Sequence, residues 1–253
     1  MSDLRRAMRS DAERRGARKG WTAVMSGASA QSADDADSIP PRELLLADAE
    51  ALTAWLRARL LAPDAPPADP INDTALFNDP RLLGRVPRQA AVLAPLYARD
   101  GQPYLLFTQR SADLSTHSGE ISFPGGSRDP ADRSLAQTAL RESQEELGLE
   151  PARVTLLGLM PPAYTVVSNF LVTPYVGWLG EGLPALRPQA AEVAEIIEAP
   201  LSALDDHLIY HTEQWTRGGV AHAVHFYDFG PYRIWGFTGR LLNDLLALLP
   251  PRA

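Results

Sequence analysis

The stretch FPGGSRDPADRSLAQTALRESQEELGL, residues 123–149, begins with a pair of glycines and ends with three glutamates inside five positions. Between these ends, apolar residues recur with the period of an amphipathic helix. The pattern predicts a helix that begins near Asp132 or Ser134, and Gly148 is the residue type that commonly ends one. We interpret the rest of the chain from this glycine turn and the helix that follows it.

The three glutamates, Glu142, Glu145 and Glu146, fall on one face of the predicted helix. Like charges at this spacing repel by roughly 0.2–0.5 kcal/mol per pair, and the negative end of the helix dipole adds to the repulsion. A solvated acidic face is one interpretation. The other is a metal site, because carboxylates suit Mg²⁺ and Mn²⁺, which in turn bind phosphate oxygens. The preceding glycines would let a ligand approach the backbone closely, which favours the metal site.

The composition is that of a protein with one sizeable core. The chain has 253 residues, of which 45% are hydrophobic and 22% charged. It has no cysteine, so disulfides, thiolate catalysis and cysteine-ligated zinc are excluded. No apolar run approaches the roughly 20 residues of a membrane span, and the net charge of -7 argues against nucleic acid as a partner. We therefore expect a cytoplasmic protein without a membrane or nucleic-acid partner.

The chain divides by composition into four parts. Residues 1–38 are small, polar and rich in charge, which predicts a disordered tail; Met25 within it is a second candidate for the biological start. Residues 39–62 carry an apolar stripe that predicts one N-terminal helix. Residues 63–87 form a proline-rich linker and approach segment. We expect the catalytic domain to occupy residues 88–250.

Within residues 88–250, short strand patterns outnumber helical ones. A hairpin is predicted around the turn ARDGQ, residues 98–102, and five further strand patterns follow the glutamate helix. The last helix is expected to begin with Thr238 as its N-cap. Many hairpins combined with a few helices indicate an α+β fold, with a mixed sheet flanked by helices.

RESQEELGL, residues 141–149, resembles the second half of the Nudix box, written G-x5-E-x7-R-E-U-x-E-E-x-G-U with U aliphatic, apart from Ser143 at an aliphatic position. The first half departs from the pattern. The position at which the pattern has its first glutamate is occupied by Arg133. If this box holds one extra residue before Arg141, the pattern's glycine is Gly126 and its acid is Asp132, with the required five residues between them. This insertion is similar to boxes in the coenzyme A branch of the family.

The segment LLFTQRSADLSTHSGEISFPGG, residues 105–126, resembles the signature that precedes the box in coenzyme A pyrophosphatases. The combined resemblance covers roughly residues 88–249. It implies a Nudix-like α/β/α sandwich with a mixed β-sheet. It also implies hydrolysis of the diphosphate bond of coenzyme A or its derivatives, dependent on Mg²⁺ or Mn²⁺, with 3',5'-ADP and 4'-phosphopantetheine as products.

The resemblance assigns roles to the box residues. Glu142 and Glu146 would be the principal Mg²⁺ or Mn²⁺ ligands. Glu145 would complete the shell or orient the attacking water, and the Gly126 carbonyl would contribute an oxygen. Arg141 would hold the carboxylates in place, although an ordinary surface ion pair is the alternative.

The upstream signature supplies candidate substrate-binding residues, which are Arg110, Ser111, His117 and Gly119. Arg110 has the planar fork that suits a phosphate, and His117 could donate to one as well. Outside a signature of this kind, a histidine in a loop is usually just solvated.

Several alternatives stay open. The general base is either Glu145 or Glu195, and Asp129 and Asp132 are expected to cap the helix rather than bind metal. The substrate could instead be a nucleotide sugar or a nucleoside triphosphate, or the chain could be a non-catalytic nucleotide-binding module. The sequence leaves a homodimer possible and does not identify the preferred coenzyme A derivative.

Overall fold

Two long strands form the centre of the structure. In the computed structural model, β1 (Arg88–Arg99) pairs in parallel with β7 (Phe170–Glu181) along nearly its whole length. On its other side β1 pairs antiparallel with β2 (Gln102–Arg110) through a tight turn, so the predicted hairpin is confirmed. Both β1 and β7 carry a continuous buried run in their middle, as expected of strands covered on two faces.

The structure describes residues 39–65, 86–111, 119–165, 168–217 and 220–252. Pro41–Ala253 form one compact unit. The predicted tail, with Met25, lies outside the described residues, and so do residues 66–85 of the expected linker. The division of the chain into four parts therefore stays a prediction.

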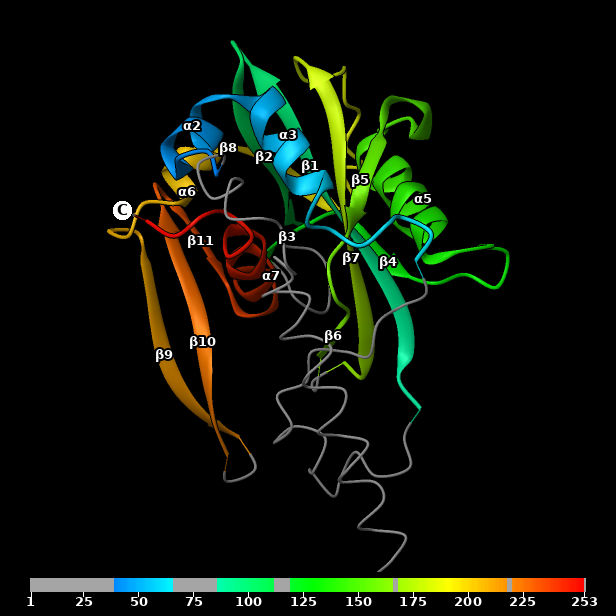
Figure 1. Cartoon of the computed structure of the whole chain (residues 1–253). Helices are drawn as coiled ribbons and strands as arrows, with labels where there is room; N and C mark the ends of the chain where they lie inside the picture. Colours follow the sequence, from blue (N-terminus) through cyan, green and yellow to red (C-terminus); the bar gives the residue numbers. More distant parts are fainter. Residues whose placement is uncertain (1–38, 66–85, 112–118, 166–167, 218–219, 253) are drawn as a thin grey trace, which may run out of the picture. The chain divides into compact units, whose positions relative to one another are not determined.

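The main sheet is mixed, as predicted. Its strands run in the order β3-β2-β1-β7-β5, while β4 also pairs with β1, β6 with β7 and β8 with β2 (Figure 1). The remaining bounds are β3 Ile121–Ser122, β4 Gly125–Ser127, β5 Thr155–Leu159, β6 Ala163–Thr165 and β8 Val193–Pro200.

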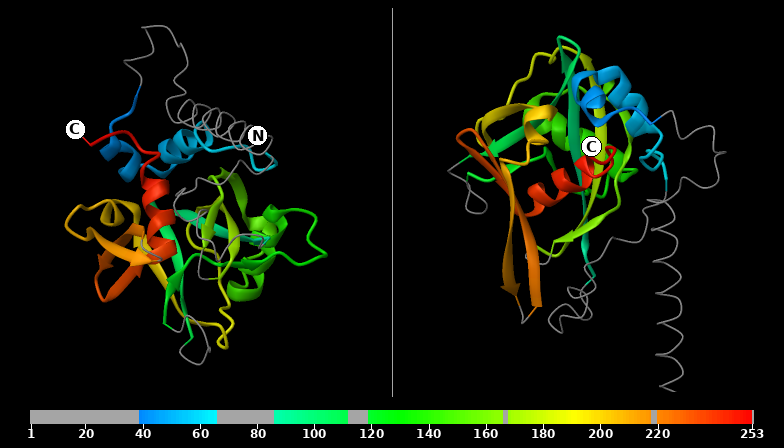
Figure 2. Two further views of the ribbon diagram at one scale, coloured as in Figure 1. Left: turned by 90° about the horizontal axis from the view of Figure 1, so that it is seen from below. Right: turned by 60° about the vertical axis from the view of Figure 1, so that its left-hand side comes forward.

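Helices cover both faces of this sheet. On one face lies α5 (Leu135–Leu147), which buries Leu135, Ala139 and Leu147 against β1 and β7. On the other lie the remaining helices, α2 (Arg42–Ala47), α3 (Ala49–Arg57), α6 (Leu201–Leu204) and α7 (Gly236–Leu246). A single turn of 3₁₀-helix, η3 (Pro151–Arg153), follows α5. Figure 2 shows the sheet between these two layers, which confirms the α+β sandwich.

The ends of α5 match the sequence pattern. The Ser134 side chain accepts a hydrogen bond from the Gln137 backbone N–H, and Gly148 ends the helix in the left-handed conformation at φ 67°. The hydroxyl of Ser134 satisfies one of the amides left unpaired in the first turn. The prediction of a helix from Ser134 to Gly148 is therefore confirmed.

The single N-terminal helix predicted for residues 39–62 is wrong, because the structure has two helices there. The break is Asp48, which has extended backbone angles of φ -130° and ψ 107°. Its carboxylate accepts hydrogen bonds from the backbone amides of Glu50 and Ala51 and so caps α3. An aspartate competes well for this capping position, and an apolar stripe alone does not reveal the interruption.

A second sheet follows the first and has three antiparallel strands in the order β11-β10-β9. They are β9 (Tyr210–Arg217), β10 (Val220–Phe229) and β11 (Tyr232–Trp235). The prediction that Thr238 caps the last helix is wrong, since α7 begins directly after β11 with Trp235 at its N-cap. The chain turns at Gly236 (φ 63°), so Thr238 lies buried inside the first turn.

A buried ion pair joins the first helix to the end of the chain. Arg42 in α2 donates through Nε to Asp205 at 2.8 Å and also contacts the second carboxylate oxygen through Nη2. The same guanidinium donates to the Pro250 carbonyl at 2.7 Å and to the Leu246 carbonyl at 3.2 Å. With Arg42 and Asp205 both under a tenth exposed, this pair fixes α2 against α6 and the end of α7.

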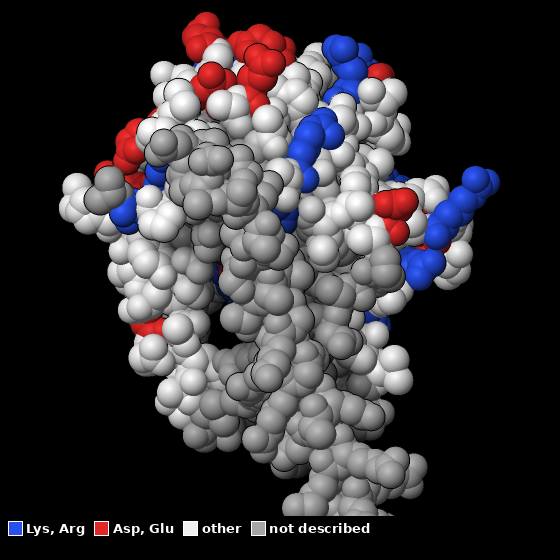
Figure 3. Space-filling model, viewed as in Figure 1, with Lys and Arg blue, Asp and Glu red and all other residues white. Residues whose placement is uncertain are grey.

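On the face drawn in Figure 3, Asp and Glu side chains gather toward the upper left, and Lys and Arg side chains lie mainly toward the right. Charges of both signs are thus displayed by the described residues of this face. None of the helices described is long and apolar enough to cross a bilayer.

Replacing Asp205 by Asn should lower the free energy of unfolding by roughly 3–5 kcal/mol, because Arg42 would stay buried without its counter-charge. Urea unfolding followed by circular dichroism measures the change. The matched control is Asp228→Asn, which removes an exposed 2.6 Å pair with Arg233 and should cost less than about 1 kcal/mol. Equal losses in the two variants would contradict the role given to the buried pair.

Candidate functional site

The glycine pair and the glutamate helix are brought together by β1. Strand β4, which contains both glycines, pairs with β1 at Ala91 and Val92, and α5 packs against both strands. Gly125 (φ 153°) has no space for a side chain, since a Cβ there would lie 2.4 Å from the Ala91 carbonyl oxygen. A Cβ on Gly126 would lie 2.6 Å from the carboxylate of Glu142. The absence of side chains on β4 is therefore what lets the acidic face of α5 approach its backbone.

Glu142 and Glu146, one helical turn apart, face this backbone. Glu146 is only 6% exposed and accepts a hydrogen bond from the backbone N–H of Gly125. Burial, and then the neighbouring Glu142 charge, raise the pKa of Glu146 to about 8. Burial also raises the pKa of Glu142, against the opposing effect of Arg141. Both carboxylates are thus harder to ionise here than in water, mainly because of burial.

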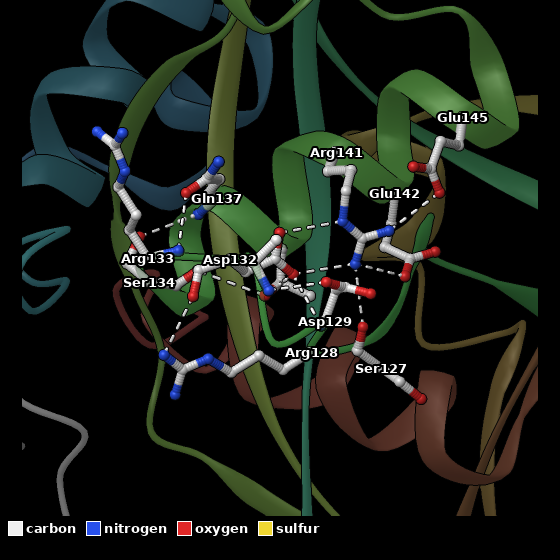
Figure 4. A network of polar contacts seen from close by, with 12 residues as sticks. Ser127, Arg128, Asp129, Asp132, Arg133, Ser134, Gln137, Arg141, Glu142 and Glu145 are labelled. Carbon is white, nitrogen blue, oxygen red and sulfur yellow. Dashed lines mark hydrogen bonds and ion pairs between the residues drawn. The ribbon is translucent and has the colours of Figure 1, made fainter.

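Arg141 lies at the centre of a polar network on the outer side of this pair (Figure 4). Its guanidinium donates to both carboxylate oxygens of Asp132, at 3.1 and 3.0 Å, and to the Ser127 carbonyl at 3.1 Å. It also pairs with Glu142 and with Glu145, each at 3.0 Å. The guanidinium thus connects the loop before α5 to two of the three box glutamates and holds them in position.

Asp132 is the anchor of this network, and the prediction that it caps α5 is wrong. It is 4% exposed and accepts hydrogen bonds from the Thr138 hydroxyl and the Asp129 backbone N–H, each at 2.9 Å. Its hydrogen bonds with Arg141 are the largest cause that lowers the pKa of Asp132 to about 2. The cap is Ser134 instead, two residues nearer the helix, and Asp129 bonds within its own turn.

Glu145 lies apart from the buried pair. Its side chain is 55% exposed and contacts Arg141 on the solvent side of the helix (Figure 4). Among the described residues, no group of three or more His, Cys, Asp or Glu side chains is already arranged around a common metal position. The structure therefore brings Glu142 and Glu146 together and leaves Glu145 at the rim.

The residues present fit a hard divalent cation. Two adjacent carboxylates with raised pKa values lie against a glycine backbone without side chains. Oxygen ligands of this kind suit Mg²⁺ and Mn²⁺, and a cation between them would favour the charged form of both carboxylates, which burial disfavours.

Arg110, at the end of β2, faces the pair from the sheet. Its charge lowers the pKa of Glu146, so the two side chains lie near one another. Its Nε is buried and finds no hydrogen-bond partner within the described residues. The backbone amide of Gly119 donates to the Arg110 carbonyl at 3.2 Å, so the two predicted residues are joined through the backbone. His117 lies outside the described residues.

Glu192 is a candidate that the sequence patterns did not single out. The loop before β8 is tied to the end of α5, because the Gln189 backbone N–H donates to the Glu146 carbonyl at 2.8 Å. The Glu192 carbonyl accepts from the backbone N–H of Ser111 at 2.8 Å, and its charge raises the pKa of both Glu142 and Glu146. Only the pairing of this loop with α5 and β2 reveals its position, since nothing local distinguishes it from neighbouring acids.

Glu195, the alternative base, has its contacts elsewhere. It lies in β8 opposite Gln109 of β2 and accepts a 2.6 Å hydrogen bond from the Tyr232 hydroxyl of β11. The carboxylate of Glu195 is thus engaged with the second sheet, whereas Glu192 acts on the α5 pair.

Comparison with known proteins identifies the family of the chain. The family model for the NUDIX domain matches residues 87–215. The Nudix hydrolase NudL of Photorhabdus laumondii subsp. laumondii is 42% identical over 166 residues, which cover 66% of this chain and 87% of that protein. NudL of Pectobacterium atrosepticum is 39% identical over 165 residues, which cover 65% and 84%. The chain therefore belongs to the Nudix family of hydrolases.

Solved Nudix structures show a partial likeness. The Nudix hydrolase RenU of M. smegmatis is 22% identical with a TM-score of 0.40, over 46% of this chain and 73% of that one. The NUDIX domain of Shewanella oneidensis NrtR, in complex with ADP ribose, is 23% identical with a TM-score of 0.38, over 52% and 85%.

The raised pKa of Glu146 predicts a stability that depends on pH in metal-free protein. Between about pH 4.5 and 8 the folded chain holds a proton that the unfolded chain has lost. The free energy of unfolding should therefore fall as the pH rises through this window, by at most about 1.4 kcal/mol per pH unit. Urea unfolding in EDTA across this range measures the slope.

Glu146→Gln should remove most of that slope, and Glu145→Gln should leave it unchanged because this side chain is largely exposed. If wild type and Glu146→Gln lose stability equally with rising pH, the carboxylate pair is not the source.

Proposed function

We propose that the protein hydrolyses the diphosphate bond of coenzyme A or its derivatives with the help of a divalent metal ion. The products would be 3',5'-ADP and 4'-phosphopantetheine. The observation that carries the hydrolase part is the pair of Glu142, partly buried against Gly126, and Glu146, buried against Gly125. The coenzyme A part is supported by the resemblance of residues 105–126 to the signature of coenzyme A pyrophosphatases.

The proposed metal ligands are Glu142, Glu146 and the Gly126 carbonyl, and Glu145 would have to turn from the rim to complete the shell. When bound, Mg²⁺ or Mn²⁺ would neutralise charge on the diphosphate and make a water molecule more acidic. Arg141 would keep Glu142 turned toward Gly126, because it ties that carboxylate to Asp132 and the preceding loop.

Arg110 is suited to hold a phosphate of the substrate. Its guanidinium is a planar fork of donors, and its buried Nε is available to an acceptor that enters the site. A phosphate at this place would be held opposite the carboxylate pair, with cations on both sides of its negative charge. Ser111 and Gly119, which follow in the same loop, would shape the substrate side of the site.

In the proposed reaction, a water oxygen attacks one phosphorus and the bond to the bridging oxygen breaks. The proton of the water passes to a carboxylate, and the other phosphate leaves with the electron pair of the broken bond. Glu192 joins Glu145 and Glu195 as a candidate for that base. Of these, Glu192 is the one whose charge acts on both Glu142 and Glu146 from a separate segment of the chain.

The substrate is tested by product analysis with coenzyme A, ADP-ribose and dGTP side by side, in Mg²⁺ and in Mn²⁺. We expect coenzyme A to be turned over fastest, to 3',5'-ADP and 4'-phosphopantetheine. Glu146→Gln should cut the rate by orders of magnitude while unfolding stays cooperative, because one metal ligand is lost. Faster turnover of ADP-ribose or dGTP would replace the substrate proposal, and full activity of Glu146→Gln would overturn the metal assignment.

The candidate bases are separated by a pair of matched variants. Glu192→Gln should lower kcat by about 10²–10⁴-fold, because a general base contributes an effect of that size. Glu195→Gln should leave the rate within a few-fold of wild type, since this carboxylate is engaged with Tyr232. A large loss confined to Glu195→Gln would reverse the assignment.

A further inference from the structure

A cavity of about 380 Å³ lies on the side of the main sheet that is opposite α5. It is bounded by α2, α6, α7, the strands β9 and β10 and the segment after α7. Figure 2 shows this last segment beside α2 and α7. The volume falls in the lower part of the range of small-molecule pockets. None of the residues that line the cavity belongs to α5, β4 or the loop of Glu192, so it is separate from the candidate active site.

The side chain of Tyr227 lines this cavity. Tyr227 lies in β10 and is only 2% exposed. Burial raises the pKa of Tyr227, so the hydroxyl stays a neutral donor. The neighbouring Tyr210 hydroxyl is already paired with Nδ1 of His225 at 3.0 Å. A neutral hydroxyl at the cavity wall can donate a hydrogen bond to an acceptor atom of a ligand.

The charges that line the cavity do not balance. Two arginines, Arg42 and Arg252, meet a single carboxylate, Asp205, which leaves a formal charge of 2 - 1 = +1. Arg42 is fully engaged with Asp205 and two carbonyls. Arg252 is half exposed, and within the described residues its contacts with Asp205 run through Nη2. Arg252 lines the cavity, and its guanidinium has further N–H donors besides those of Nη2.

Apart from Asn243 and the two tyrosines, the rest of the wall is apolar, formed by Leu204, Leu246 and Leu249 together with Ala247 and Pro251. Such a wall favours a ligand with an apolar body over a bare hydrated ion. The formal charge of +1 on the lining residues favours a ligand with one negative charge. We propose that this cavity binds a small carboxylate with an apolar body, whose carboxylate accepts from Arg252 and from the Tyr227 hydroxyl. The proposal is independent of the reaction at the α5 site.

The test uses benzoate, titrated into the full-length protein and followed by isothermal titration calorimetry and ligand-detected NMR. Benzamide, which has nearly the same shape but no charge, and inorganic phosphate, which has no apolar body, are the two comparison probes. We expect saturable binding of one benzoate per chain, with benzamide and phosphate each at least about tenfold weaker. Absence of saturable benzoate binding, or equal binding of either comparison probe, would overturn the proposal.

Variants assign the binding to this cavity. Arg252→Gln should weaken benzoate binding at least about tenfold. Tyr227→Phe should weaken it several-fold while leaving the unfolding transition intact, because the change removes only a hydroxyl. Arg233→Gln, which removes an exposed arginine of β11 that does not line the cavity, should bind as wild type does. Binding that is unchanged in both cavity variants, or weakened equally by Arg233→Gln, would place benzoate elsewhere and reject the site.

Discussion

The close approach of the β4 backbone to the acidic face of α5 is the constraint on which the site depends. Gly126 can lie against Glu142 only because it has no Cβ, and Gly125 can pair with β1 for the same reason. Because α5 also packs on β1, the helix cannot retreat from β4 without losing its buried face. Packing therefore keeps Glu142 and Glu146 close together despite the repulsion between their charges.

This arrangement explains how a helix tolerates several acids near its C-terminus. Arg141 neutralises the outer part of the cluster and is itself fixed by Asp132, whose buried carboxylate is held by Thr138 and the Asp129 amide. The inner part, at Glu146, keeps a raised pKa because burial outweighs the nearby charge of Arg110. The protein thus stabilises the position of the carboxylates, and the proposed cation would balance their inner charge.

The C-terminal part of the chain has its own polar centre at Arg42 and Asp205. It joins α2, α6 and the segment after α7 on the face of the sheet away from α5. The second sheet connects back to the first through the Tyr232–Glu195 hydrogen bond. Elements outside the glutamate helix and its strands are therefore tied to the Nudix domain by specific polar contacts as well as by apolar packing.

The amino-acid sequence by itself determined the features that depend on local chemistry. The bounds of α5 follow from Ser134 and Gly148, the first hairpin follows from its polar turn, and the mixed sheet follows from many short strand patterns. The box resemblance identified the family and the glutamates before any coordinates. The break at Asp48 and the early start of α7 were missed, because a capping side chain and a turn at Gly236 interrupt or begin a helix without changing its apolar period.

Only the tertiary structure decided which acids act together. Glu142, Glu145 and Glu146 look alike in sequence, yet packing buries Glu146 and leaves Glu145 at the rim. Asp132 became the anchor of Arg141, and Glu192 rather than Glu195 came to act on the pair, through contacts between segments far apart in the chain. The pKa of a carboxylate depends on the groups around it in space. For the glutamates of α5, these groups come from β1, β2, β4 and the loop before β8, and not only from residues adjacent in the sequence.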